Sequence, residues 1–288
     1  MPKWLPRRRV FAQPGIVLLA IVSSSIAAGQ LALPRNLAVA LAQAGPATYK
    51  APRSPSKDGK PDLNGIWQAN NTANWDIQGH SARQGPVLEL GAAFSVPAGL
   101  GVVEGDEIPY QPWAAAKKKE NAAKWLELDP EIKCFMPGVP RANYMPYPFQ
   151  IVQTPTHILM AYEFASASRT IYMNSKEESP ADTWMGWSRG RWEGDTLVVD
   201  VNAFNGQTWF DRAGNFHSDA LRVVERYTPI SRDVLQYDVT IEDPKVFTRP
   251  WKMSMPLYRR AEKNAQLLEY KCVEFVEELM YGNLKKKP

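Results

Sequence analysis

A predicted β-hairpin near the middle of the chain constrains the fold more than any other feature. An aromatic run over Trp184–Trp192 is followed by Glu193-Gly194-Asp195 and then by the β-branched run Thr196–Val201. Glycine between two acidic residues is typical of a tight turn, because glycine adopts positive φ without steric cost. Two strands joined this closely pair antiparallel, so the sequence predicts a sheet built from neighbouring segments.

A third strand is predicted over Ala220–Tyr227, after a polar loop. Because side chains alternate along a strand, one face carries the odd-numbered residues: Leu221, Val223, Glu225 and Tyr227. Glu225 is thus an acid on an apolar face, and it has two interpretations. Either it pairs with an arginine inside the sheet as a structural bridge, or burial raises its pKa and it contacts a ligand. Arg226 lies on the opposite face.

Further short strands are expected along the rest of the chain: Phe149–Gln153, His157–Phe164, Arg169–Met173, Val234–Glu242, Trp251–Tyr258 and Gln266–Cys272. Helices are expected at Pro112–Leu128 and, more briefly, at Glu274–Tyr281. About nine strands at short spacing indicate an all-β fold, either a sandwich or a barrel. We expect an antiparallel barrel with one or two peripheral helices.

The first 44 residues have the form of an export signal. Arg7, Arg8 and Arg9 precede an apolar stretch, Ile16–Ala28, that is too short for a comfortable membrane span. Small residues typical of a signal-peptide cleavage site precede the bonds after Ala28 and after Ala44, and the sequence does not decide between these two sites. The Arg8-Arg9 pair also resembles a twin-arginine signal. We therefore expect a periplasmic or secreted protein without a stable membrane anchor, with residues 45–61 as a flexible linker and 62–288 as one barrel domain.

Charge and cysteine content narrow the partners and the compartment. The expected signal holds five of the 34 basic residues and none of the 30 acidic ones. The processed chain is therefore close to neutral and lacks the excess of basic residues typical of nucleic-acid-binding proteins. The chain has two cysteines, Cys134 and Cys272. In an oxidising compartment this pair favours a disulfide, and two buried free thiols are the alternative.

The loop before the third strand carries the candidate catalytic residues, His217 and Asp211. A histidine whose pKa lies near neutrality can exchange protons, and a carboxylate such as Asp211 can orient its ring. In this interpretation Glu225 would contact the substrate. The alternative is a loop histidine that hydrogen-bonds a backbone carbonyl and organises the turn. Candidate ligand-binding residues are aromatic or positively charged: Trp209, Arg226, Tyr227, Trp187 and Tyr162. The glycine-rich segment Gly91–Gly105 is a candidate lid.

Neither a metal nor a cofactor is expected. His80 and His157 stand alone, without the spacing of metal ligands, and neither cysteine belongs to a CxxC pair. The sequence has no GxGxxG motif and no phosphate-binding loop.

Several long motifs resemble a family of proteins exported by Gram-negative bacteria. They are DLNGIW, YPFQIVQTP, WMGWSRGRWEGDTLVVD, FDRAGNFHSDALRVVERY and TIEDPKVFTRPW, and they extend from Asp62 to about Phe275. This resemblance implies export and brings no reaction with it. The R-x-W-x-G-D-x-L hairpin followed by an E-R-Y strand also resembles the calycins, the lipocalin and fatty-acid-binding group. That likeness implies a barrel with an internal cavity for an apolar ligand.

Three functions follow from these features. The first is periplasmic binding of a small, largely apolar or aromatic molecule. The second is a metal-free, cofactor-free lyase, isomerase or hydrolase that uses His217 with Asp211 and Glu225. The third is a structural or interaction protein of the cell envelope. A pocket lined by His217 and Glu225 would separate the first two from the third.

Overall fold

The computed structural model describes residues 49–281 apart from 57, 86–90 and 93–94. The expected signal, residues 1–44, lies outside the described residues, and so does the start of the expected linker. From Tyr49 onward the linker segment is described. Ala51 and Ser54 are buried, and the Asp62 amide donates to the Pro52 carbonyl at 2.8 Å.

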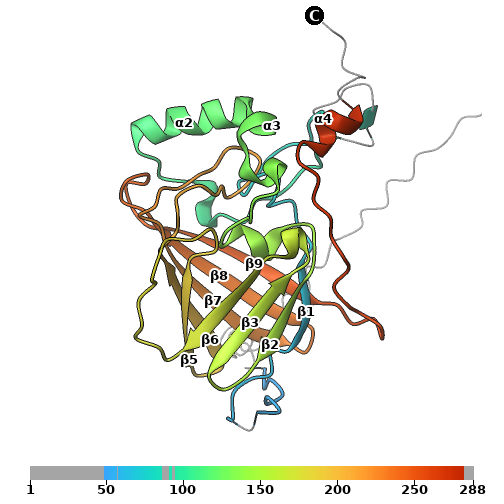
Figure 1. Cartoon of the computed structure of the whole chain (residues 1–288), viewed down its shortest axis with the longest axis vertical. Helices are drawn as coiled ribbons and strands as arrows, with labels where there is room; N and C mark the ends of the chain where they lie inside the picture. The colour runs from blue at the N-terminus through green and yellow to red at the C-terminus, as the bar shows by residue number, and fades with distance from the viewer. Residues whose placement is uncertain (1–48, 57, 86–90, 93–94, 282–288) are drawn as a thin grey trace, which may run out of the picture. The chain divides into compact units, whose positions relative to one another are not determined.

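Nine strands in the described part of the chain form a closed barrel (Figure 1). In chain order they are β1 (Gly65–Ala69), β2 (Phe149–Gln153), β3 (His157–Tyr162), β4 (Ser168–Met173), β5 (Trp187–Glu193), β6 (Thr196–Asn202), β7 (Arg222–Ser231), β8 (Val234–Glu242) and β9 (Trp251–Arg259). Each strand pairs with the next one in sequence, and β1 pairs with β9 to close the barrel. The predicted all-β barrel is confirmed.

One strand pair departs from the predicted antiparallel arrangement. β4 and β5 are parallel, and their pairing is short, from Ile171 opposite Ser188 to Met173 opposite Gly190. The irregular segment 174–186 joins the end of β4 to the start of β5. It returns the chain to the end of the barrel where β4 began, so both strands run in the same direction. The barrel is therefore mixed.

The central hairpin is confirmed, with one change at its start. Glu193 at the end of β5 pairs with Thr196 at the start of β6, and Gly194 between them has a φ of 61°. β5 begins at Trp187, three residues later than predicted, because Gly186 has a φ of 67° that interrupts the extended run.

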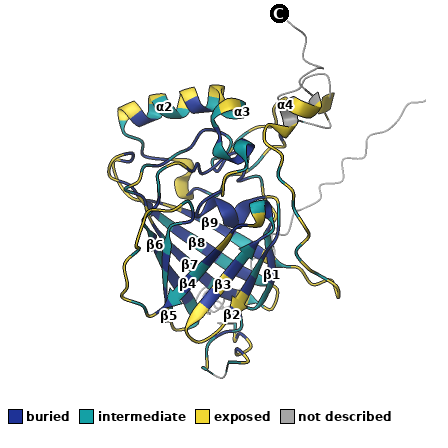
Figure 2. Ribbon diagram, viewed as in Figure 1, coloured by how far each residue is buried: buried dark blue, intermediate teal, exposed yellow. Residues whose placement is uncertain are grey.

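Alternation along the strands builds the interior. In β8 the alternate residues Leu235, Tyr237, Val239 and Ile241 are all buried, as are the four odd-numbered residues predicted to share a face around β7. Figure 2 shows buried residues alternating with less buried ones along the strands. The largest fully buried side chains include Trp67, Tyr144, Tyr227, Tyr237 and Phe149. Side chains thus occupy the inside of the barrel.

The α-helices of the described chain lie outside the strands (Figure 1). α2 (Pro112–Ala123) and α3 (Trp125–Leu128) replace the single helix predicted for this region, because Lys124 leaves helical geometry with φ −123° and ψ 26°. Short 3₁₀ turns are η2 (Glu104–Asp106), η3 (Pro130–Lys133), η4 (Arg141–Tyr144) and η5 (Phe164–Ser166). The buried Asn121 of α2 donates to the Gly214 carbonyl at 3.4 Å, which seats α2 on the loop before β7.

The strand predicted over Gln266–Cys272 is wrong, since these residues are irregular. Because β1 and β9 pair with each other, neither the first nor the last strand of the barrel has a free edge for another strand. The helix predicted after it is present as the shorter α4 (Val276–Tyr281). No helix in the described part of the chain is both long enough and apolar enough to cross a membrane.

Candidate functional site

A polar cluster lies inside the barrel, among apolar side chains. We call it the interior network; its members are Arg169 on β4, Glu225 and Tyr227 on β7, Tyr237 on β8, Tyr162 on β3 and Asn143 in η4. All are nearly or fully buried. Strand register brings them together, since Tyr227 lies opposite Tyr237 and Arg169 lies opposite Met160.

The Glu225 carboxylate is the centre of the interior network. Arg169 donates to it through Nη1 at 2.7 Å and through Nη2 at 3.1 Å. The Tyr237 and Tyr227 hydroxyls donate to Oε1 at 2.6 and 2.8 Å, and Asn143 Nδ2 donates to the same oxygen at 2.9 Å. A buried charge needs this degree of pairing. Of the two interpretations of Glu225, the structure contains the bridge to an interior arginine.

Burial also decides how the other members titrate. It raises the pKa values of Tyr227 and Tyr237 well above the ordinary value, and the negative charge of Glu225 raises them further. Burial likewise raises the pKa of Tyr162 to about 12. It lowers the pKa of Arg169, but attraction to Glu225 outweighs this and leaves that pKa well above its usual value. The three hydroxyls therefore stay protonated as donors, and Arg169 stays charged.

A pocket of about 270 Å³ opens in the barrel wall beside this network. We call it the lateral pocket; its lining is Met136, Ser168, Arg169, Thr170, Tyr172, Thr183, Trp184, Met185, Gly186, Trp187 and Ser188. It lies where the β4–β5 pairing is absent. That pairing begins only at Ile171, so the first half of β4 faces the irregular residues before β5. At this gap the inward-facing Arg169 and Ser188 form part of the pocket lining.

Aromatic rings form much of the pocket wall. Trp187 stacks on Tyr172, with ring centroids 4.4 Å apart and planes inclined by 20°. Trp184 stacks on Phe135 at 4.6 Å and 13°. These pairs hold flat, rigid surfaces in place around the opening. Flat aromatic side chains thus line part of the lateral pocket.

Arg169 connects the lateral pocket with the interior network. Its Nη2 donates to Glu225, to the Tyr227 hydroxyl at 2.9 Å and to Met160 Sδ at 3.2 Å. Its Nη1 donates to Glu225 and reaches Ser188 Oγ at 3.4 Å. Its Nε is buried and has no hydrogen-bond partner among the described residues. One guanidinium N–H is thus left without an acceptor.

His217 is buried and both of its ring nitrogens are engaged. Nδ1 lies 2.8 Å from the Ser218 carbonyl oxygen, to which it donates, so Nε2 accepts from the Thr208 hydroxyl at 2.6 Å. The ring lies near Phe204 and Phe210, and burial lowers its pKa. This is the geometry expected of a neutral histidine that organises its loop.

Asp211 is fully buried among backbone amides. Its carboxylate accepts from the amides of Ile77, Ala213 and Asn215 and from Asn215 Nδ2, at 2.6–3.1 Å. Burial and then the neighbouring Asp76 raise the pKa of Asp211 to about 7, although the Asn215 and Ile77 hydrogen bonds oppose this. Within the described structure no hydrogen bond joins His217 to Asp211 or to Glu225. The three predicted catalytic side chains thus have separate partners, and their catalytic roles stay predictions.

The predicted ligand-binding residues fall into four places. Trp187 lines the lateral pocket, and Tyr162 and Tyr227 lie in the interior network. Trp209 is largely buried in the loop before β7, where its backbone forms an isolated antiparallel β-bridge with Phe216. Arg226 is on the outer face, as predicted, and pairs with Glu193 Oε2 at 2.9 Å.

Sequence reasoning missed the residues that connect these places. Arg169 lies at an inward position of β4, alternating with the buried Ile171 and Met173, so the argument that singled out Glu225 would also have found it. Ser188 likewise is a polar residue at a buried position of β5. Met136 and Asn143 come from the proline-rich segment 134–150, where no periodicity indicates which side chains face the barrel.

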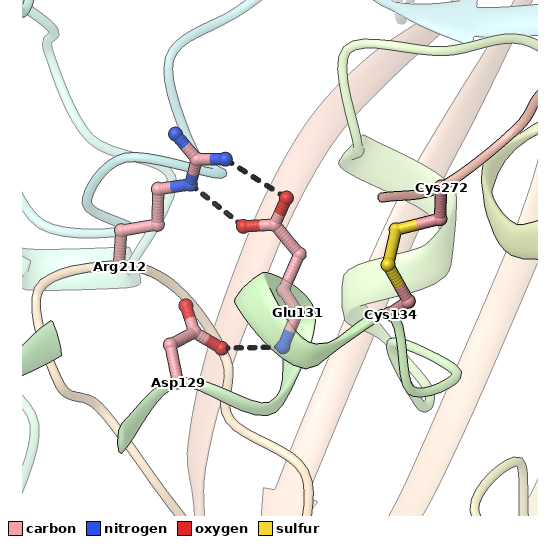
Figure 3. Close-up of a disulfide and its surroundings, with 5 residues drawn as sticks. All are labelled: Asp129, Glu131, Cys134, Arg212 and Cys272. Atoms are coloured by element: carbon pink, nitrogen blue, oxygen red, sulfur yellow. Dashed lines mark hydrogen bonds and ion pairs between the residues drawn. A yellow bond between two sulfur atoms is a disulfide. The ribbon is translucent and has the colours of Figure 1, made fainter. Parts of the chain in front are cut away.

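A disulfide and a cluster of charges hold that proline-rich segment in place (Figure 3). The predicted bond between Cys134 and Cys272 is confirmed. Beside it, Asp129 accepts from the Glu131 amide at 3.0 Å, and Arg212 donates to Glu131 at 2.7 and 2.8 Å.

Arg141 completes this cluster. Its guanidinium is fully buried and donates to both oxygens of Asp129, at 2.8 and 2.9 Å. The same segment supplies Met136 to the lateral pocket and Asn143 to the interior network. The cluster and the disulfide therefore fix part of the candidate site.

The described residues contain no group of three His, Cys, Asp or Glu side chains placed to hold a metal ion. Comparison with known proteins does not assign a function: no protein-family model matches the chain, and no curated protein matches it either. The geometry of the lateral pocket and the interior network is the basis for the function proposed below.

Proposed function

We propose that this protein binds a small, largely apolar or aromatic molecule in the lateral pocket. The observation that carries the proposal is an aromatic-walled pocket lined at its inner side by a buried, charged arginine. Ligand sites combine apolar walls with a few convergent polar groups in this way. Here Trp184, Trp187 and Tyr172 would supply the walls, and Arg169 with Ser188 the polar groups.

The size and position of the pocket define the molecule. At about 270 Å³ the pocket falls just below the range of drug-sized sites, roughly 300–1,000 Å³, so one or two fused rings would fit. The ligand would enter through the barrel wall, because aromatic and aliphatic side chains fill the barrel interior. This differs from the internal cavity that the calycin resemblance implies.

An exported location agrees with the Cys134–Cys272 bond, since such bonds persist in oxidising compartments. We accordingly propose that binding takes place in the periplasm or outside the cell. The enzymatic alternative has less support. His217 and Asp211 are buried and do not line the lateral pocket, and Glu225 reaches it only through Arg169.

The test combines ligand detection with one substitution in the pocket wall. Native mass spectrometry of protein purified from the periplasm should find a bound small molecule. Titration with 2-acetylnaphthalene should quench tryptophan fluorescence at a stoichiometry of one. Trp187→Leu removes half of the stacked pair with Tyr172 and should weaken binding roughly tenfold, a free-energy difference of about 1.4 kcal/mol.

Trp113→Leu is the matched control. Trp113 lies on α2, is 55% exposed and is not part of the pocket lining, so the same substitution there should leave affinity unchanged. Two results together would reject the proposal: no co-purified molecule, and no aromatic probe binding with a dissociation constant below about 1 mM.

A further inference from the structure

Arg169 is the charged residue of the lateral pocket lining, and its charge is already balanced. The other ten lining residues are methionine, serine, threonine, tyrosine, tryptophan or glycine. Glu225 lies directly behind Arg169 and takes two of its N–H groups at 2.7 and 3.1 Å. A ligand carboxylate would therefore meet no excess positive charge, and it would be held close to a second buried carboxylate.

The same arginine still has one N–H to donate. Arg169 is 5% exposed, both of its Nη atoms are engaged, and its Nε has no partner in the described part of the chain. A buried donor without an acceptor is costly, and a group that supplies the acceptor recovers that cost. Sites built around such a donor discriminate strongly against analogues that lack the acceptor.

We infer that the lateral pocket recognises an uncharged aromatic molecule with a carbonyl oxygen that accepts the Arg169 Nε–H, and that it discriminates against carboxylates. This inference rests on the proposed binding function and names the ligand class for the same site. The aromatic part contacts Trp187, Tyr172 and Trp184. The carbonyl points inward to Arg169, beside the Ser188 hydroxyl. Glu225 determines selectivity without touching the ligand, because it neutralises the guanidinium.

The experiment compares three probes of one ring system: naphthalene, 2-acetylnaphthalene and 2-naphthoate. Each is titrated into the full processed chain with its disulfide intact. The acetyl compound should bind at least tenfold more tightly than either of the others. Its carbonyl stretch should shift to lower frequency in the complex, which reports the hydrogen bond directly and requires no substitution.

The outcomes separate the inference from the function on which it rests. Binding of none of the probes would argue against the proposed function itself. Equal binding of naphthalene and 2-acetylnaphthalene would retain an aromatic site and overturn the inference. Tightest binding of 2-naphthoate would overturn it as well, because an uncompensated positive charge would then dominate.

Two substitutions test the parts of Arg169 separately. Arg169→Lys keeps the charge but removes Nε, so the advantage of the acetyl compound over naphthalene should disappear. Glu225→Gln leaves the guanidinium unbalanced and should shift preference toward 2-naphthoate by at least tenfold. Arg189→Lys, at a β5 position outside the pocket lining, is the matched control and should change neither ratio. If the interior variants fail to fold, the probe ratios and the carbonyl shift in the unmodified protein still decide the question.

Discussion

Removing Arg169 should destabilise the barrel far more than removing an arginine from its surface. In Arg169→Met the apolar stem of the side chain is largely replaced, but the fully buried Glu225 carboxylate loses both guanidinium hydrogen bonds. The hydroxyls of Tyr227 and Tyr237 still donate to it, yet no other cation is paired with it in the described structure. A buried carboxylate left in this state is strongly unfavourable.

The size of the effect follows from that burial. Breaking a buried ion pair by removing one partner costs about 3–5 kcal/mol, so Arg169→Met should lower the free energy of unfolding by that amount. Arg169→Met/Glu225→Gln removes the orphaned charge as well. Its loss should be smaller than the sum of the two single losses by about 2 kcal/mol or more, as expected for residues in direct contact.

Arg222→Met provides the matched control on the outer face of β7. Arg222 pairs with Asp200, and its side chain is 53% exposed, so its loss should cost no more than about 1 kcal/mol. The measurement is urea unfolding at neutral pH, followed by tryptophan fluorescence with the disulfide intact. Equal losses for the two arginine variants, or additive losses in the double variant, would refute the buried-charge argument.

Three further predictions concern the disulfide and two buried titratable groups. Because the Cys134–Cys272 bond closes a loop with a sequence separation of 138, replacing both cysteines by serine should lower the free energy of unfolding by up to about 5 kcal/mol. Two reactive thiols in the unmodified protein, denatured without reductant, would contradict the bond. Burial lowers the pKa of His217 from 6.5, so its contribution to stability is present above about pH 6.5 and is lost as the pH falls below that value; an NMR midpoint at or above 6.5 would be inconsistent with a buried neutral ring. Burial and Asp76 raise the pKa of Asp211 from 3.8 to about 7, so the folded protein holds this proton more tightly and stability should fall as the pH rises through that interval; carboxyl NMR showing a midpoint near 4 would disprove this.

Local chemistry in the sequence was enough for much of the barrel. Gly194 between two acidic residues predicted the turn, since its positive φ is a property of the residue itself. Alternation placed Glu225 and Tyr227 on one face, because a pleated strand imposes a period of two wherever it occurs. Two cysteines in a chain with an expected export signal were enough to predict their pairing. Each of these inferences depends on neighbouring residues or on a count.

The tertiary structure decided which distant residues meet. Arg169 and Glu225 are 56 residues apart, and an inward-facing acid does not by itself show which arginine will reach it. The parallel β4–β5 pair, and with it the gap that forms the lateral pocket, depends on the path of the irregular segment 174–186. The strand predicted at Gln266–Cys272 failed for a related reason. Its local pattern was adequate, but β9 already pairs with β1 and so had no free edge to receive it, and a strand forms only where a partner supplies its hydrogen bonds.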